Sequence, residues 1–453
     1  MSPRNLTTGS IASRILELAW PTAIAMTLHL AFHIVDMVFV GRLGPDAIAA
    51  VAMTGTVIFL LFGISAGLGV GTTSLIARSL GAGQPDVAET AARQGFLLAL
   101  VTGLGCAGGS LVIQRILFPA LGAGRSLLPV ILRYSTWIFT GVPFIFIVTV
   151  ASGILRGQGD MKTPMFVMVF SVLTNAVLDP LLIFGLGPFP ELGVTGAALA
   201  TVIARILGAA ALVWYLVRGN PAVGLSVRPL AFTAKVVEDI LAVGLPSSLR
   251  HVTMSVSAMF LFRILSPFGG AAMAAYGLTA RLNSMAIMPC LAIGTAVITL
   301  VGQNVGAGKA DRAARTTWAG VVWAMILMET VGITFFLTPR LWARIFTDDA
   351  QVIAHVVSYL RIVPLTYMFI GVSIVTGAAF LGAGKAVPAL VITGLRLVIL
   401  AVPGAVILSL FLGVNGVWLA IAGSTVAAAL VSAAWFRLGT WKPAPDLQVA
   451  AAP

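Results

Sequence analysis

Charged residues are scarce in this sequence. They make up only 9% of its 453 residues, and there are only two cysteines and four histidines. A soluble domain carries about 25% charged residues, so a chain of this length could not cover a water-facing surface with so few. The two cysteines, Cys106 and Cys290, both lie in apolar runs, which argues against a disulfide framework or a metal site. These scarcities exclude the ordinary soluble classes of protein.

Apolar residues dominate instead, at 59% of the chain. A helix needs about 20 apolar residues to cross the hydrocarbon core of a membrane, and runs of that length recur from end to end. We therefore predict an all-α integral membrane protein with twelve transmembrane helices. Their expected ranges are roughly 15–40, 47–76, 92–117, 128–153, 163–187, 194–217, 238–262, 271–299, 315–337, 354–380, 387–411 and 414–436.

The distribution of basic residues predicts how the chain is oriented across the membrane. The chain has 27 Lys and Arg against 15 Asp and Glu, a net charge of +12. Fifteen basic residues fall in one set of predicted loops and helix ends and seven in the opposite set. Lys and Arg accumulate in cytoplasmic loops, so this excess indicates contact with membrane lipids and the cytoplasm, with no nucleic-acid partner. We expect a multi-pass protein of the cell (inner) membrane with both termini in the cytoplasm.

An internal repeat organises the chain. Leu18-Ala-Trp-Pro21 aligns with Val243-Gly-Leu-Pro246. The stretch from Arg78 to Asp86 aligns with the stretch from Gln303 to Asp311 at the same offset, and each contains Gly-Ala-Gly. The offset covers six predicted helices, so corresponding helices point the same way across the membrane, as in parallel-repeat transporters.

The repeat predicts two pseudo-symmetric lobes. Residues 1–218 would form an N-terminal six-helix lobe, 219–237 a cytoplasmic linker, and 238–453 a C-terminal six-helix lobe. Two such lobes that rock about a shared cleft give alternating access, which favours a secondary transporter. A duplicated channel or scaffold is the alternative.

Several stretches together resemble the multidrug and toxic compound extrusion (MATE) family. They are Pro21, Val35–Gly44, the two Gly-Ala-Gly loops, Leu155–Asp160, Asn175–Pro180 and Gly196–Thr201. The resemblance covers nearly the whole chain. It implies a V-shaped pair of six-helix bundles around a central cavity, and a cation-driven antiporter that exports small organic compounds, often cations. It implies no enzyme activity and no cofactor beyond a coupling ion, and we expect a monomer.

Only a few carboxylates fall within predicted spans, namely Asp36, Asp179 and Glu329. A charge at mid-membrane costs about 2.5–3.5 kcal/mol on insertion scales, so such a group is a candidate for function. Asp36, Asp179 and Thr201 all lie roughly 6–12 Å below the outer ends of their predicted helices. Asn175 shares a helix face with Asp179. These depths permit one polar cluster in the N-terminal lobe, whereas Glu329 has no matched partner and favours a structural role.

Two coupling ions suit this cluster. Two carboxylates, a carboxamide and a hydroxyl are oxygen ligands for Na⁺, whereas repulsion between two buried carboxylates favours a bound proton. We favour H⁺ over Na⁺ and expect no other metal. The resemblance implies the same residues, because in the DinF-like branch matching groups on helices 1, 5 and 6 form the coupling site. The alternative is structural: Asp179 would cap a break before Pro180, and Asp36 would anchor at the interface.

Three further residues of the first predicted helix are candidates. Pro21 removes a backbone hydrogen bond and predicts a kink, which is either static or linked to protonation. His29, His33 and Asp36 share one helix face, so the two imidazoles could relay protons or line a cavity. Packing histidines are the favoured interpretation.

The second lobe lacks matching acids. Leu261 stands opposite Asp36 in the repeat, and the intramembrane charges are Arg250, Arg263, Arg281 and Arg396. We expect these arginines to reach lipid headgroups or backbone carbonyls near helix ends. If several faced the cavity, anionic or zwitterionic substrates, or a lipid-linked precursor flippase of related architecture, would become the alternative.

Overall fold

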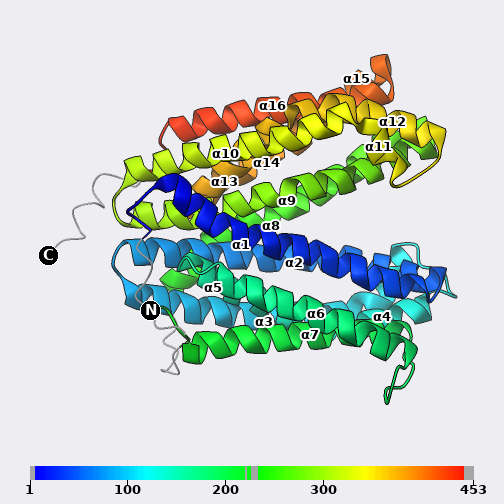
Figure 1. Cartoon of the computed structure of the whole chain (residues 1–453), viewed down its shortest axis with the longest axis horizontal. Coiled ribbons are helices and arrows are strands. Elements are labelled where there is room, and N and C mark those ends of the chain that lie inside the picture. Colours follow the sequence, from blue (N-terminus) through cyan, green and yellow to red (C-terminus); the bar gives the residue numbers. More distant parts are fainter. Residues whose placement is uncertain (1–5, 220–221, 226–232, 443–453) are drawn as a thin grey trace. The chain divides into compact units, whose positions relative to one another are not determined.

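The computed structural model describes residues 6–219, 222–225 and 233–442, and within these ranges the regular structure is entirely helical (Figure 1). Twelve helical spans are long and apolar enough to cross a membrane, which confirms the predicted fold class and span number. Their ends extend beyond several predicted ranges, because the helices continue into polar flanks such as Pro85–Arg93.

The spans are single helices or runs of consecutive helical segments. They are α1 (Ile11–Gly41), α2 (Pro45–Gly81), α3 (Pro85–Ala120), α4 and α5 (Leu128–Thr140, Val142–Gly157), α6 (Lys162–Phe184), α7 and η1 (Val194–Trp214, Tyr215–Gly219), α8 and η2 (Ala234–Leu265, Ser266–Phe268), α9 (Gly270–Gly306), α10 (Ala310–Leu337), α12, η3 and α13 (Ala350–Ile362, Val363–Thr366, Tyr367–Gly382), α14, η4 and α15 (Ala386–Gly394, Leu395–Ala401, Val402–Leu412) and α16 (Val414–Arg437). The short α11 (Pro339–Arg344) lies between α10 and α12.

The chain forms two compact units. The first contains Ile24–Ser248, and the second contains Asn5–Ala23 together with the chain from Leu249 onward. The divisions within α1 and α8 fall two residues after Pro21 and two residues after Pro246, which are equivalent positions of the repeat. The predicted lobe boundaries at 218 and 238 follow the connecting segment instead, and they remain a prediction.

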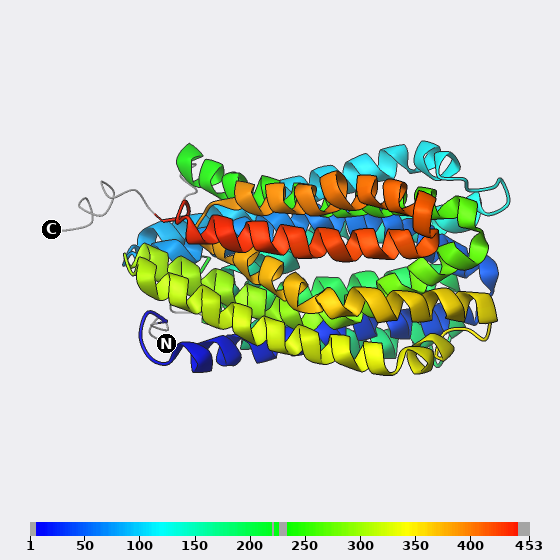
Figure 2. The same ribbon diagram turned by 90° about the horizontal axis from the view of Figure 1, so that it is seen from above.

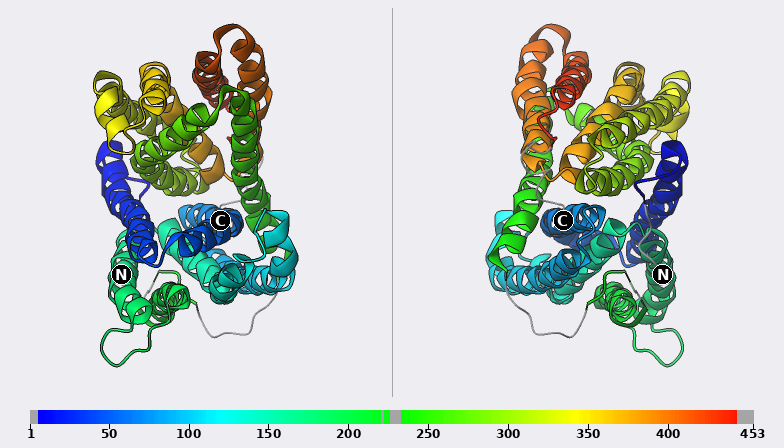
Figure 3. Two further views of the ribbon diagram at one scale, coloured as in Figure 1. Left: turned by 90° about the vertical axis from the view of Figure 1, so that its right-hand side faces the viewer. Right: turned by 90° about the vertical axis from the view of Figure 1, so that its left-hand side faces the viewer.

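The first unit is held by a core of small and branched side chains. Buried residues of α2, α3 and α5 pack together, among them Leu68, Ala92 and Phe146. The helices of each unit run side by side and are seen nearly end-on in Figure 3. Small side chains allow this close approach, which drives helix association in lipid.

One glycine motif recurs at the same place in both units. Gly193 begins α7 with φ 55°, and Gly413 begins α16 with φ 58°, a backbone conformation that favours glycine. Three residues later, a Cβ on Gly196 would lie 2.2 Å from the Leu182 carbonyl oxygen, and one on Gly416 would lie 2.1 Å from that of Leu408. The motif therefore presses α7 onto α6, and α16 onto α15.

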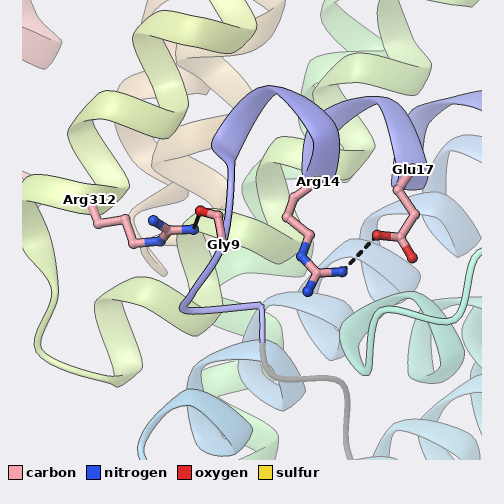
Figure 4. A network of polar contacts seen from close by, with 4 residues as sticks. All are labelled: Gly9, Arg14, Glu17 and Arg312. Atoms are coloured by element: carbon pink, nitrogen blue, oxygen red, sulfur yellow. Dashed lines mark hydrogen bonds and ion pairs between the residues drawn. The ribbon is translucent and has the colours of Figure 1, made fainter.

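In the second unit, the start of α1 and the end of α16 lie at the same end of the helix bundle (Figure 2). The segment before α1 is tied to the start of α10. Lys309 donates to the Thr7 hydroxyl (3.0 Å), and Arg312 donates to the Gly9 carbonyl (2.8 Å; Figure 4). Arg14 and Glu17 form an ion pair at 2.8 Å nearby. These contacts fix the start of α1 within the second unit.

Candidate functional site

Helix α6 positions two of the expected site residues. Asn175 and Asp179 are both buried, and the Asn175 amide donates a hydrogen bond of 3.1 Å to Oδ1 of Asp179. Pro180 removes one backbone donor, yet α6 continues to Phe184. Asp179 therefore does not cap a helix end. It shares a buried helix face with Asn175, as their spacing in the sequence predicts.

Asp36 and Thr201 are brought to the same region by α1 and α7. Asp36 is buried five residues before the end of α1, and Asp179 is five residues before the end of α6. The two carboxylates interact electrostatically. Thr201 is buried on α7, which the Gly196 contact presses onto α6. All four predicted residues thus lie within the first unit, and the two acids and Thr201 share a similar depth, about 8–11 Å from their helix ends.

Two residues of this region were missed by the sequence analysis. Tyr134 of α4 is buried and interacts electrostatically with both Asp36 and Asp179. Arg205 of α7 interacts with Asp36. Arg205 lies one helical turn after Thr201, so its spacing on an apolar helix was a usable signal. Tyr134 gave no such signal, since a tyrosine in an apolar run is ordinary. We call these six residues the acid cluster.

The acid cluster has unused hydrogen-bonding capacity. Four buried oxygen atoms have no hydrogen-bond partner among the described residues: Asp36 Oδ1, Asn175 Oδ1, Asp179 Oδ2 and Thr201 Oγ1. The Nη1 atom of Arg205 is likewise buried and unpartnered within this part of the chain. Buried polar groups are nearly always satisfied, so this concentration indicates a place for a bound ion or proton. The oxygen set fits either a small hard cation or a shared proton.

Other candidates were expected on α1, and a further acid on α10. Pro21 is buried inside a continuous helix, at the point where α1 passes from one unit to the other. The His29 ring stacks on Phe62 with centroids 5.8 Å apart, which is a packing contact. The side chain of His33 lies outside the described part of the structure. Glu329 accepts a hydrogen bond of 3.3 Å from the Met368 amide, near the start of α13, as a structural role would require.

The second unit separates its four intramembrane arginines into two kinds. Arg263 and Arg281 are exposed, and Arg263 donates to Ser266 at 3.4 Å near the end of α8. Arg250 and Arg396 are partly buried and interact electrostatically with each other. Arg263 thus lies near a helix end, as expected, whereas Arg250 and Arg396 lie well inside their spans. Contact of any of the four with lipid headgroups stays a prediction.

The fold and these sites define a multi-pass helical membrane protein built from two repeats. A family model described as MatE matches residues 21–181 and again residues 246–407. The two matches begin at Pro21 and Pro246, which are the prolines that the repeat aligns. Together they cover more than half of the chain, so the chain belongs to the MatE family.

Relatives of known name span nearly the whole chain. An FAD transporter of Shewanella oneidensis is 28% identical over 92% of this chain and 92% of its own length. A probable multidrug resistance protein NorM of Thermotoga maritima is 27% identical over 95% and 93%. A solved structure of a MATE family multidrug resistance transporter, in an outward-facing conformation, matches with a TM-score of 0.92 at 29% identity, over 98% of this chain and 99% of that one.

Proposed function

We propose that this protein is a secondary active antiporter that exports small organic compounds in exchange for protons. The relatives named for multidrug resistance support export, and the one named for FAD extends the class to a phosphate-bearing cofactor. The proposed substrates therefore include both drugs and phosphate-bearing compounds. The protein would act as a monomer in the cell membrane, with both termini in the cytoplasm.

The unsatisfied acid cluster is the observation that carries this proposal. Asp36 and Asp179 are two carboxylates in one buried region, and each has an oxygen without a partner among the described residues. Burial and mutual repulsion disfavour two simultaneous negative charges. A proton taken up by either acid reduces that repulsion and supplies a donor for an unpartnered oxygen. Loss of the proton on the other side of the membrane would restore the repulsion and complete one half of the exchange.

Arg205 favours a proton over sodium. Its guanidinium is a permanent positive charge that already interacts with Asp36. A second cation in the cluster would be repelled by it, whereas a proton binds directly to a carboxylate oxygen and needs no coordination shell. The neutral oxygens of Asn175 and Thr201 support the sodium alternative, because Na⁺ is held by several oxygen ligands.

The distribution of acids supports assignment to the DinF-like branch. Leu261 occupies the position equivalent to Asp36, and no intramembrane acid matches Asp179 in the second repeat. A coupling site confined to the first unit follows from this. A flippase for lipid-linked precursors is the second candidate, and Arg250 and Arg396 are the observation in its favour.

Transport by the purified protein in liposomes tests the coupling ion. We expect an imposed proton gradient, in sodium-free buffer, to drive movement of a fluorescent dye such as ethidium. Collapse of this gradient by a protonophore should abolish that movement. Transport that requires sodium and ignores the proton gradient would overturn the proton assignment and make the four oxygen-bearing residues a sodium site.

A further inference from the structure

Arg250 and Arg396 lie near the middle of their spans. The span Ala234–Phe268 has its midpoint at residue 251, and the span Ala386–Leu412 has its midpoint at residue 399. From Arg250 the nearer helix end is sixteen residues away, or about 24 Å along the axis. From Arg396 the nearer end, Ala386, is ten residues away, or about 15 Å. An arginine side chain cannot cover either distance to reach a headgroup, so neither charge is explained by snorkelling to the membrane surface.

Two hydrogen bonds hold the helices of these arginines together. The Arg250 Nε donates to the Thr393 hydroxyl at 3.2 Å, and Ser257, two turns further along α8, donates to the Leu397 carbonyl at 3.1 Å. Thr393 and Arg396 are three residues apart, so they lie on one face of α14 and η4. The π-helical form of η4 leaves carbonyls such as that of Leu397 available to side chains, and such segments are frequent at functional sites.

No carboxylate neutralises this pair among the described residues. The described ion pairs join Arg14 to Glu17 and Lys235 to Glu238 and Asp239, all near the ends of α1 and α8. The charge that acts most strongly on Arg250 is that of Arg396, which is a like charge. The Tyr359 hydroxyl, which Asn283 holds in place, is the polar group that interacts with Arg396. Two unneutralised guanidinium groups at mid-membrane require an anion to offset their repulsion.

We infer that Arg250 and Arg396 bind an anionic group of the transported compound, a phosphate or a carboxylate. A guanidinium presents paired N–H donors that match the oxygens of such groups, and two of them can grip one phosphate from two sides. Thr393 fixes the Arg250 side chain, and the Tyr359 hydroxyl adds a neutral group beside Arg396. The inference rests on the proposed export function, of which it specifies a substrate class.

Riboflavin and riboflavin 5′-phosphate provide a matched pair of probes, because they share one ring system and differ in a single phosphate. Binding to the purified full-length protein is measured by flavin fluorescence, without any ion gradient. We expect the phosphate form to bind at least tenfold more tightly. Arg250→Gln and Arg396→Gln should each remove about tenfold of that preference, as expected for loss of one hydrogen-bonded charge contact. Arg263→Gln, a matched change outside the pair, should retain it.

Folding and the source of the anion are controlled separately. Arg250→Lys and Arg396→Lys keep the charge and should recover part of the preference, and each variant must elute as a single species in detergent. Farnesyl diphosphate, added as a competitor, represents a lipid-borne phosphate. Displacement of bound riboflavin 5′-phosphate by farnesyl diphosphate, and not by inorganic phosphate, supports the anion site and the flippase alternative.

Equal binding of the two flavins, with no competition by the lipid diphosphate, would overturn the anion site. So would a preference that survives in both glutamine variants. Neither result tests the proposed coupling of transport to protons, which is measured by gradient-driven transport of a cationic dye. Conversely, an intact phosphate preference in a protein that no gradient can drive would overturn the proposed function and leave the anion site standing.

Discussion

The two units share one framework but hold different charged side chains within their spans. The first buries Asp36 and Asp179 and holds them beside one arginine, whereas the second holds Arg250 beside Arg396 with no carboxylate paired to either among the described residues. The glycine motif and the prolines of the repeat recur in both. The repeat thus preserves the positions where helix packing leaves no room for side chains. The polar residues have diverged, so the duplicated fold can assign ion coupling to one unit and substrate charge to the other.

The strongest test of this division is to neutralise the acids of the first unit. Asp36→Asn and Asp179→Asn should each reduce gradient-driven transport by at least tenfold, because a single carboxylate leaves no pair to bind and release a proton. Neither change adds a buried charge, so folding should be retained. Glu329→Gln, which removes an acid in the second unit that binds a backbone amide, should retain substantial transport.

Transport is measured in liposomes with an imposed proton gradient, after matching the amounts of protein. Flavin-phosphate binding by the two asparagine variants should be unchanged if the units act separately. Normal pumping by both variants would refute the coupling site. If Glu329→Gln lost as much transport as the two asparagine variants, the proposed difference between the units would be refuted.

The shared framework can be tested by replacing the packed glycine of each motif with alanine. Gly196→Ala and Gly416→Ala should destabilise the protein by similar amounts, about 1–3 kcal/mol, since each new Cβ meets a backbone oxygen at 2.2 or 2.1 Å. Thermal unfolding in detergent measures the effect. Gly423→Ala, where a Cβ would meet no atom within 4 Å, serves as the control. A large loss for one motif glycine and none for the other would show that the two units are packed by different rules.

A smaller effect is expected when Arg205, the positively charged side chain of the acid cluster, is replaced. Arg205→Gln deletes the positive charge that interacts with Asp36, so the cluster should bind Na⁺ several-fold more tightly than the unaltered protein. Binding of radioactive sodium to the purified protein measures this change, with Arg218→Gln at the end of the same span as the control. If Arg205→Gln binds no more sodium than the unaltered protein, Arg205 is not the residue that makes the acid cluster prefer protons to sodium.

The smallest perturbation tests the shared orientation of the repeats. Cysteines at Gly83 and Gly308, which are equivalent positions of the two Gly-Ala-Gly loops, should both be protected from an impermeant thiol reagent in intact cells. A cysteine at Glu191, between α6 and α7, should react. The background is a variant in which Cys106 and Cys290 are replaced by serine. Labelling of all three from outside would reverse the orientation, and labelling of only one of the two glycine positions would contradict parallel repeats.

Much of the first unit's site was predictable because membrane helices follow simple rules. Depth could be counted along apolar runs at about 1.5 Å per residue, which placed Asp36, Asp179 and Thr201 at one level. The four-residue spacing of Asn175 and Asp179 predicted their shared face, and they are hydrogen bonded. Arg205 could have been found by the same spacing from Thr201. Tyr134 could not, since nothing in an apolar helix distinguishes a packing tyrosine from one that interacts with two carboxylates.

The sequence by itself determined the class of this protein: twelve helices, two parallel repeats and one polar level in the first of them. These follow from hydrophobic length, residue spacing and internal similarity, which are properties of the chain alone. The tertiary structure decided which charges meet. Arg250 and Arg396 lie far apart in the sequence, and the packing of α8 beside the α14–η4 segment, with two hydrogen bonds between them, brings the two side chains together. Contacts between distant segments depend on how helix faces pack, and no local pattern encodes them.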